Sequence, residues 1–161
     1  MVLRSVNRSM FAYLFAVALV TDAFAFFYGM LFGKHKLTHI SPKKTWEGAI
    51  GGSIVGTTIG TLCAYFFGPL FGYGDFTIFD PIGNFLYMQP VVKIFVIILI
   101  TFVGTIISQI GDLAASKIKR SYDAKDFGNI FPGHGGVMDR FDSTSLVAIY
   151  IISLVVLLGG I

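Results

Sequence analysis

Charged residues are scarce in this sequence, and their scarcity limits the class of protein. Only 13% of the 161 residues are charged, whereas 55% are hydrophobic, and the mean hydropathy is +0.77. A soluble domain of this size could not cover its surface with so few charges, so lipid must be the solvent for much of it. The single cysteine, Cys63, excludes an internal disulfide. The net charge of +3 is too small to indicate a nucleic-acid partner.

Long apolar stretches account for the hydropathy. They cover residues 10–32, 46–71, 91–115 and 145–161. About 20 apolar residues span a bilayer core as a helix. The stretches lack the two-residue alternation of strands. We therefore expect an all-α, polytopic membrane protein with about four transmembrane helices, located in the cell or inner membrane.

Lysine and arginine are absent from residues 45–92, although both neighbouring connections are basic. These basic connections are residues 33–45 and 116–144. Cytoplasmic loops carry the excess of Lys and Arg. We expect both basic connections on the cytoplasmic face and the middle connection outside.

Glycine recurs every fourth residue in the second apolar stretch. The four glycines are Gly48, Gly52, Gly56 and Gly60. They predict one helix face on which another backbone can approach closely. Ser41 as a cap and Pro42 at the first helical position predict where this helix begins.

Polar residues follow one face of the third stretch at spacings of three and four. They are Thr105, Ser108, Gln109, Asp112, Ser116 and Lys119. Such a face is typical of the wall of a wet site, or of hydrogen bonding between helices. The second interpretation accounts well for Ser108 and poorly for Asp112, because a carboxylate in a membrane costs several kcal/mol without a cationic partner.

Residues 116–142 concentrate groups suited to phosphate and metal. The charged and titratable candidates are Lys119, Arg120, Lys125, Asp126, His134, Asp139, Arg140 and Asp142. Basic side chains bind phosphate oxygens, and Mg²⁺ prefers carboxylates. Asp139 and Asp142 share a face at the expected start of the last helix, where capping is the alternative role. The residues alone indicate metal-dependent phosphoryl chemistry on a lipid at the cytoplasmic face.

Three stretches match one longer pattern. The first runs Ser116-x-x-Lys119-Arg120, Lys125-Asp126-x-Gly128 and Phe131-Pro132-x-His134-Gly135-Gly136-x-x-Asp139-Arg140-x-Asp142. The others are Ser41-Pro42-Lys43-Lys44-Thr45-Trp46-Glu47-Gly48, and Asp22 followed by Ala23-Phe24-Ala25-Phe26. This pattern resembles the signature of the phosphatidate cytidylyltransferase family. Members of that family carry further helices before the one with Asp22, so we expect residues 1–161 to form a single membrane-embedded catalytic domain without those helices.

The resemblance implies transfer of the cytidylyl group of CTP to phosphatidate, giving CDP-diacylglycerol and pyrophosphate, with one or two Mg²⁺ ions. It implies metal ligation by Asp112 and Asp139, with Asp142 and Asp126 as further candidates. The implied catalytic residues are Asp112, Lys125, Asp126, Asp139, Arg140 and Asp142. The implied substrate-binding residues are Asp22, Lys44, Glu47, Ser116, Lys119, Arg120, His134, Gly135 and Gly136.

Three alternatives stay open at this point. Another CTP-using membrane enzyme, such as a polyprenol kinase or the archaeal enzyme for ether-linked lipids, would share much of the chemistry. A transporter with Asp22 and Asp112 on an ion path would account for intramembrane carboxylates, and a non-catalytic subunit would account for a retained motif. The expected partners are CTP, phosphatidate and membrane lipid. A homodimer is left open, and no residue is identified that reads the cytosine.

Overall fold

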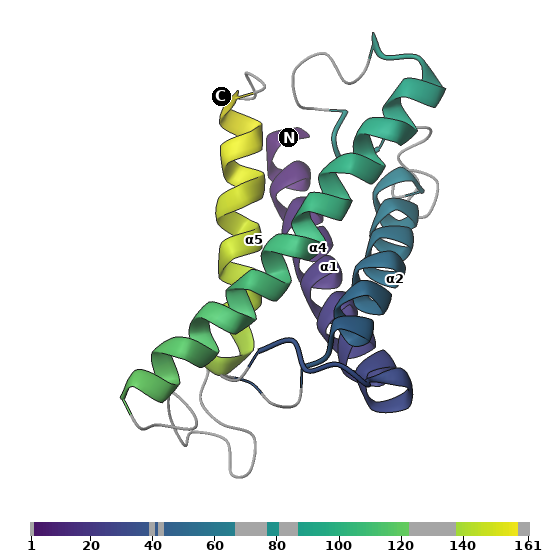
Figure 1. Cartoon of the computed structure of the whole chain (residues 1–161). Coiled ribbons are helices and arrows are strands. Elements are labelled where there is room, and N and C mark those ends of the chain that lie inside the picture. Colours follow the sequence, from purple (N-terminus) through teal and green to yellow (C-terminus); the bar gives the residue numbers. More distant parts are fainter. Residues whose placement is uncertain are drawn as a thin grey trace.

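Helices make up nearly all of the regular structure in the computed structural model (Figure 1), which describes residues 2–38, 41, 44–66, 77–80, 87–122 and 138–157. The helices are α1 (Val2–Phe32), α2 (Trp46–Tyr65), α4 (Pro90–Ser121) and α5 (Met138–Leu157). Within the described ranges the only β-type pairing is an isolated bridge. The predicted all-α class is therefore confirmed.

Two helices of the described chain are long and apolar enough to cross a membrane. They are residues Ala12–Phe32 of α1 and the whole of α4, Pro90–Ser121. The apolar part of α5, Ser143–Leu157, is shorter. Large apolar side chains such as Leu31, Phe95 and Leu157 are exposed on the helices, as lipid-facing surfaces require. Two helices thus have the length and apolar composition that a crossing needs, and the expectation of four crossings stays a prediction.

The glycine face of α2 packs against α1, as its spacing predicts. A Cβ added at Gly48 would collide with the backbone of Ala25 and Gly29, and one at Gly52 with Ala25. At Gly56 the obstacle is shared between Thr21 of α1 and Thr105 of α4. Because these glycines lack side chains, α1 and α4 can both pack closely against α2.

The start of α2 differs from the prediction at Ser41 and Pro42, which was wrong. The helix begins at Trp46, and the side chain of Thr45 caps it by accepting a hydrogen bond from the Gly48 N–H at 3.1 Å. The preceding backbone is extended, because Lys36 and Thr45 form an antiparallel bridge and the Leu37 N–H donates to the Lys44 carbonyl at 2.8 Å. Because the backbone before Trp46 is paired in this way, α2 begins at Trp46 and not at Pro42.

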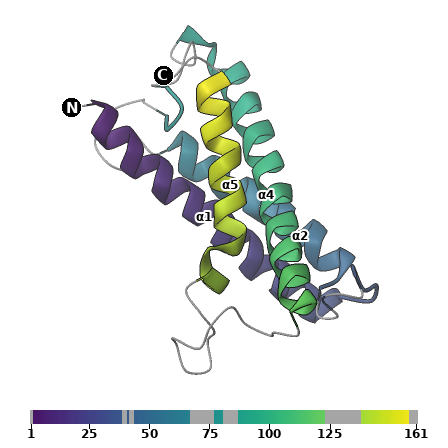
Figure 2. The same cartoon turned by 90° about the vertical axis from the view of Figure 1, so that its left-hand side faces the viewer.

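The two basic connections start and finish at the same end of the bundle. The last turns of α1 and α4 and the first turns of α2 and α5 are at that end in both views (Figures 1 and 2). At the other end, the buried carboxylate of Asp80 accepts a hydrogen bond from Lys93 at 2.6 Å, and Phe79 packs edge-on against Tyr13. The fold therefore separates a polar end, which borders both basic connections, from the end that holds Asp80 and Lys93.

Candidate active site

A cavity of about 240 Å³ lies at the polar end of the bundle. It is lined by Asp22, Ala25 and Phe26 of α1, by Leu37, Ser41, Lys44 and Thr45 of the connection, by Ala49 of α2, and by Gln109 and Asp112 of α4. Two of the predicted acids and one predicted base therefore meet in one place. They come from segments far apart in the sequence.

An ion pair between Lys44 and Asp112 is the main electrostatic feature of the cavity. The Lys44 ammonium contacts Asp112 Oδ2, and their side chains are only 25% and 28% exposed. The pairing of the extended backbone at Lys44 with Leu37 sets its position. A carboxylate within a membrane needs a cationic partner, and Lys44 is that partner for Asp112. The cavity thus holds a positive and a negative group in contact.

Asp22 supplies the second carboxylate, and α5 orients it. Ser143 Oγ donates a hydrogen bond to Asp22 Oδ2 at 2.7 Å, and Ser143 is only 4% exposed. Ser143 is not among the residues predicted from the sequence. The available signal was its position four residues after Asp139, which puts the two on one face of α5.

Gln109 ties α4 to α2 beside the acids. Its Nε2 donates to the Ala49 carbonyl at 3.0 Å and to Ser53 Oγ at 2.8 Å. In the described part of the chain Gln109, and not Ser108, makes the hydrogen bonds between these helices. The polar face of α4 therefore has both of the roles considered for it. Gln109 makes hydrogen bonds between helices, and Asp112 lines the cavity.

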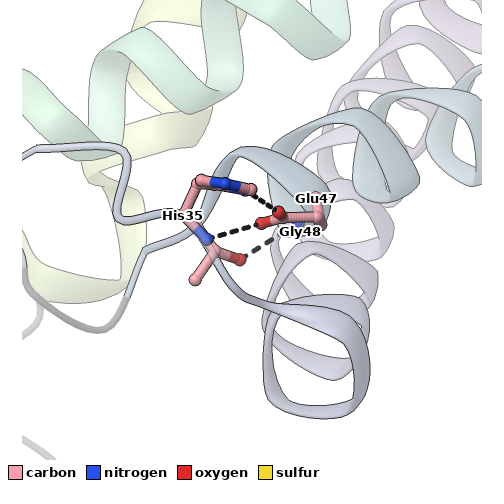
Figure 3. A network of polar contacts seen from close by, with 4 residues as sticks. His35, Glu47 and Gly48 are labelled. Carbon is pink, nitrogen blue, oxygen red and sulfur yellow. Dashed lines mark hydrogen bonds and ion pairs between the residues drawn. The ribbon is translucent and has the colours of Figure 1, made fainter.

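Glu47 lies outside the cavity lining and pairs with the connection (Figure 3). Its Oε1 lies 2.6 Å from His35 Nδ1, and its Oε2 accepts from the His35 N–H at 3.3 Å. The imidazole hydrogen bond, with backbone N–H groups, lowers the pKa of the Glu47 carboxyl to about 2. Glu47 fastens the connection to the first turn of α2, and so acts next to Lys44 without facing the cavity.

The remaining predicted residues fall on the last turns of α4, on the first turns of α5, or outside the described residues. Ser116, Lys119 and Arg120 occupy the last turns of α4, with Ser116 and Lys119 half-buried and Arg120 exposed. Asp139, Arg140 and Asp142 belong to the first turns of α5, and their side chains lie outside the described part of the structure. Lys125, Asp126, His134, Gly135 and Gly136 lie outside the described residues.

The donor chemistry of the cavity suits a hard cation. Asp22 and Asp112 offer carboxylate oxygens, which Mg²⁺ prefers. No group of three or more His, Cys, Asp or Glu side chains capable of holding a metal occurs within the described ranges. Asp139 and Asp142, which the sequence predicts as further ligands, have side chains outside the described part of the structure.

The fold and the cavity define a helical bundle of membrane type, with a charged site where several of its helices end. The model of the cytidylyltransferase family matches residues 2–158, and the chain belongs to this family.

Several members of this family with a named activity are similar to the chain. The chain is 38% identical to the phosphatidate cytidylyltransferase of Staphylococcus haemolyticus over 136 residues, which are 84% of this chain and 44% of the relative. It is 37% identical to the Bacillus subtilis enzyme of that name over 145 residues, 88% of this chain and 46% of the relative. Against the Brucella melitensis enzyme it is 41% identical over 131 residues, 81% of this chain and 40% of the relative. The chain thus spans less than half the length of these relatives.

Proposed function

We propose that the chain provides the reaction site of a phosphatidate cytidylyltransferase, which forms CDP-diacylglycerol in phospholipid biosynthesis. The observation that carries this proposal is the Lys44–Asp112 pair in a cavity shared with Asp22. Membership of the cytidylyltransferase family and the names of the relatives give the chemistry. A transporter would have no need of the phosphate-binding pattern that surrounds these acids.

The reaction requires the alignment of two strongly anionic substrates. An oxygen of the phosphatidate phosphate attacks the α-phosphorus of CTP. The bond from that phosphorus to the bridging oxygen breaks, and pyrophosphate leaves with the electron pair. The attacking phosphate is already ionised near neutral pH, so the protein needs no strong base. It must offset charge and hold the reacting atoms in line.

The cavity residues would perform that task together. The Lys44 ammonium would bind a phosphate oxygen as a point charge. The hydroxyl groups of Ser41 and Thr45, which also line the cavity, can donate to others. The side chains of Lys119, Arg120, Lys125 and Arg140 would add positive charge from the end of α4 and from residues 123–140. Lys44 would exchange part of its contact with Asp112 for contact with substrate.

We extend the proposal to Mg²⁺, held by Asp112 with Asp139 and Asp142. A bound Mg²⁺ would neutralise phosphate charge and stabilise the pyrophosphate that departs. Asp22 would stay oriented by Ser143, as it is in the structure. The site would face the cytoplasm, where CTP is found, with membrane lipid around the helices. A homodimer also stays a prediction.

Product analysis tests the proposed function. The chain in lipid nanodiscs would receive CTP, Mg²⁺ and phosphatidate, and the products would be separated by chromatography. Formation of CDP-diacylglycerol with an equal amount of pyrophosphate is expected. A lipid phosphate formed together with CDP from a lipid alcohol would indicate a kinase instead. No turnover of CTP with either lipid would contradict an enzymatic role for the chain.

A further inference from the structure

The side-chain amide of Gln109 is fixed so that it can present only an acceptor to the cavity. Both amide hydrogens are donated to α2, one to the Ala49 carbonyl and one to Ser53 Oγ. A carbonyl oxygen can only accept, so the contact with Ala49 determines which end of the amide carries the hydrogens. Gln109 also lines the cavity. The group that remains available to a ligand is therefore its Oε1.

The cavity wall near Gln109 differs from the wall near the charged groups. Ala49 accepts the Gln109 hydrogen bond through its backbone carbonyl, and its side chain is apolar. Ala49 lines the cavity, as do Ala25 and Phe26 of α1. Asp112 lies three residues further along α4, on the same face and about one turn away. One face of α4 thus places a neutral acceptor beside the phosphate-binding pair.

We propose that Gln109 selects cytosine by accepting a hydrogen bond from its exocyclic amino group, an inference that rests on the proposed function. CTP and UTP differ at ring position 4, where cytosine carries an amino donor and uracil an acceptor oxygen. Gln109 Oε1 pairs with the amino group and opposes the uracil oxygen. Its own amide hydrogens are held by α2, so rotation of the amide to suit uracil would break two hydrogen bonds. The amide of Gln109, held by these two hydrogen bonds, therefore favours cytosine over uracil.

The test compares kcat/KM for CTP, UTP and dCTP in the parent chain, Gln109→Met and Ser53→Ala. Methionine keeps the length of glutamine and removes the acceptor, so the preference for CTP over UTP should fall by about tenfold to a hundredfold. The ratio of CTP to dCTP should not change. Ser53→Ala removes one tether but leaves Oε1 and the Ala49 contact, so it should keep the CTP preference.

Three results would overturn the inference. The first is an unchanged CTP-to-UTP ratio in Gln109→Met. The second is a change in the CTP-to-dCTP ratio instead, which would make Gln109 a reader of the ribose. The third is an equal loss of preference in Ser53→Ala, which would make Gln109 only a tether between helices.

A measurement on the unaltered chain removes dependence on the folding of a variant. 5-Iodo-CTP keeps the amino group and carries its photoreactive iodine on the neighbouring ring atom. Irradiation should label the tryptic peptide of residues 94–117, which contains Gln109, and excess CTP should suppress the label. A label confined to other peptides would overturn the inference. Crosslinking needs binding and not turnover, so a labelled but inactive chain would contradict the proposed reaction while supporting the role of Gln109.

Discussion

At the scale of single residues, the site is built from charges that neutralise one another. Lys44 and Asp112 are each about three-quarters buried and in contact. A buried charge that loses its partner is costly, whereas a pair with alternative partners can exchange them. Asp22 is separately anchored by Ser143. The arrangement thus holds two carboxylates and an ammonium in one cavity.

Replacing Lys44 by methionine tests this arrangement. The change leaves the Asp112 carboxylate without its cation and removes the proposed phosphate ligand, so activity should fall by on the order of a hundredfold or more. Lys36→Met is the matched control, because Lys36 lies on the same connection and is exposed. It should retain most of the activity. Equal losses in both variants, measured as CDP-diacylglycerol formed by folded protein, would mean that the connection matters only for its overall charge.

The individual site contacts were not accessible from the sequence. Sequence analysis showed that Asp112 needs a cation, but several lysines were available, and the choice of Lys44 depends on the bridge between Lys36 and Thr45. The Ser143–Asp22 bond joins α5 to α1, and no local pattern connects such distant segments. Glu47 matched the pattern, yet its carboxylate is directed to His35.

At the scale of the helices, close packing depends on the absence of side chains. The buried residues of α2 are all glycine or alanine, and Gly56 lies where α1 and α4 both approach. In a membrane, helices associate through close contact and interhelical hydrogen bonds rather than by exclusion of water. The Gln109 bonds to Ala49 and Ser53 reinforce this contact. The glycine face therefore positions the walls of the cavity.

A larger side chain at Gly56 should separate these helices. Gly56→Leu would force its side chain against Thr21 and Thr105, at a cost of roughly 1–3 kcal/mol or more. The expected result is a lower folded yield and a lower thermal midpoint, measured by size exclusion in detergent. Thr58→Leu, on an exposed part of the same helix, is the control and should behave as the parent. Normal stability of Gly56→Leu would contradict the packing described.

Helices were easier to predict than their ends. Long apolar stretches specify a helix wherever the solvent is lipid, so the existence of the four helices that the structure describes and the glycine face of α2 followed from the sequence. The ends depend on local competition. Ser41 and Thr45 are both good caps, and the backbone pairing of Lys44 with Leu37 decides in favour of Thr45. The last turns of α4 and the first of α5 lie in polar sequence, where hydropathy gives no signal.

At the scale of the whole molecule, the charge distribution and the directions of the helices indicate the same orientation in the membrane. The ends of α1 and α4 and the starts of α2 and α5 lie at one end of the bundle, and this end carries the basic connections (Figures 1 and 2). Cytoplasmic loops are the basic ones. The bundle should therefore be oriented with its cavity toward the cytoplasm, where CTP would enter directly.

Cysteine labelling tests the orientation. Ser121→Cys, exposed at the end of α4, should resist an impermeant thiol reagent in intact cells and react after the membrane is opened. Tyr87→Cys, exposed just before α4 begins, should react from the outside. Both would be made with Cys63 replaced by alanine. The opposite labelling pattern would reverse the assigned orientation.

The central claim is that cytidylyl transfer takes place in the cavity that contains Asp112. The most direct measurement is CDP-diacylglycerol formation by Asp112→Asn in lipid nanodiscs, with folding confirmed by an unchanged elution volume. Asparagine keeps the size of aspartate and removes its charge, so the variant tests the carboxylate and not the packing. Loss of a charge contact made in the transition state should reduce the rate by about a thousandfold or more. A folded Asp112→Asn protein that makes CDP-diacylglycerol at close to the parent rate would contradict the account.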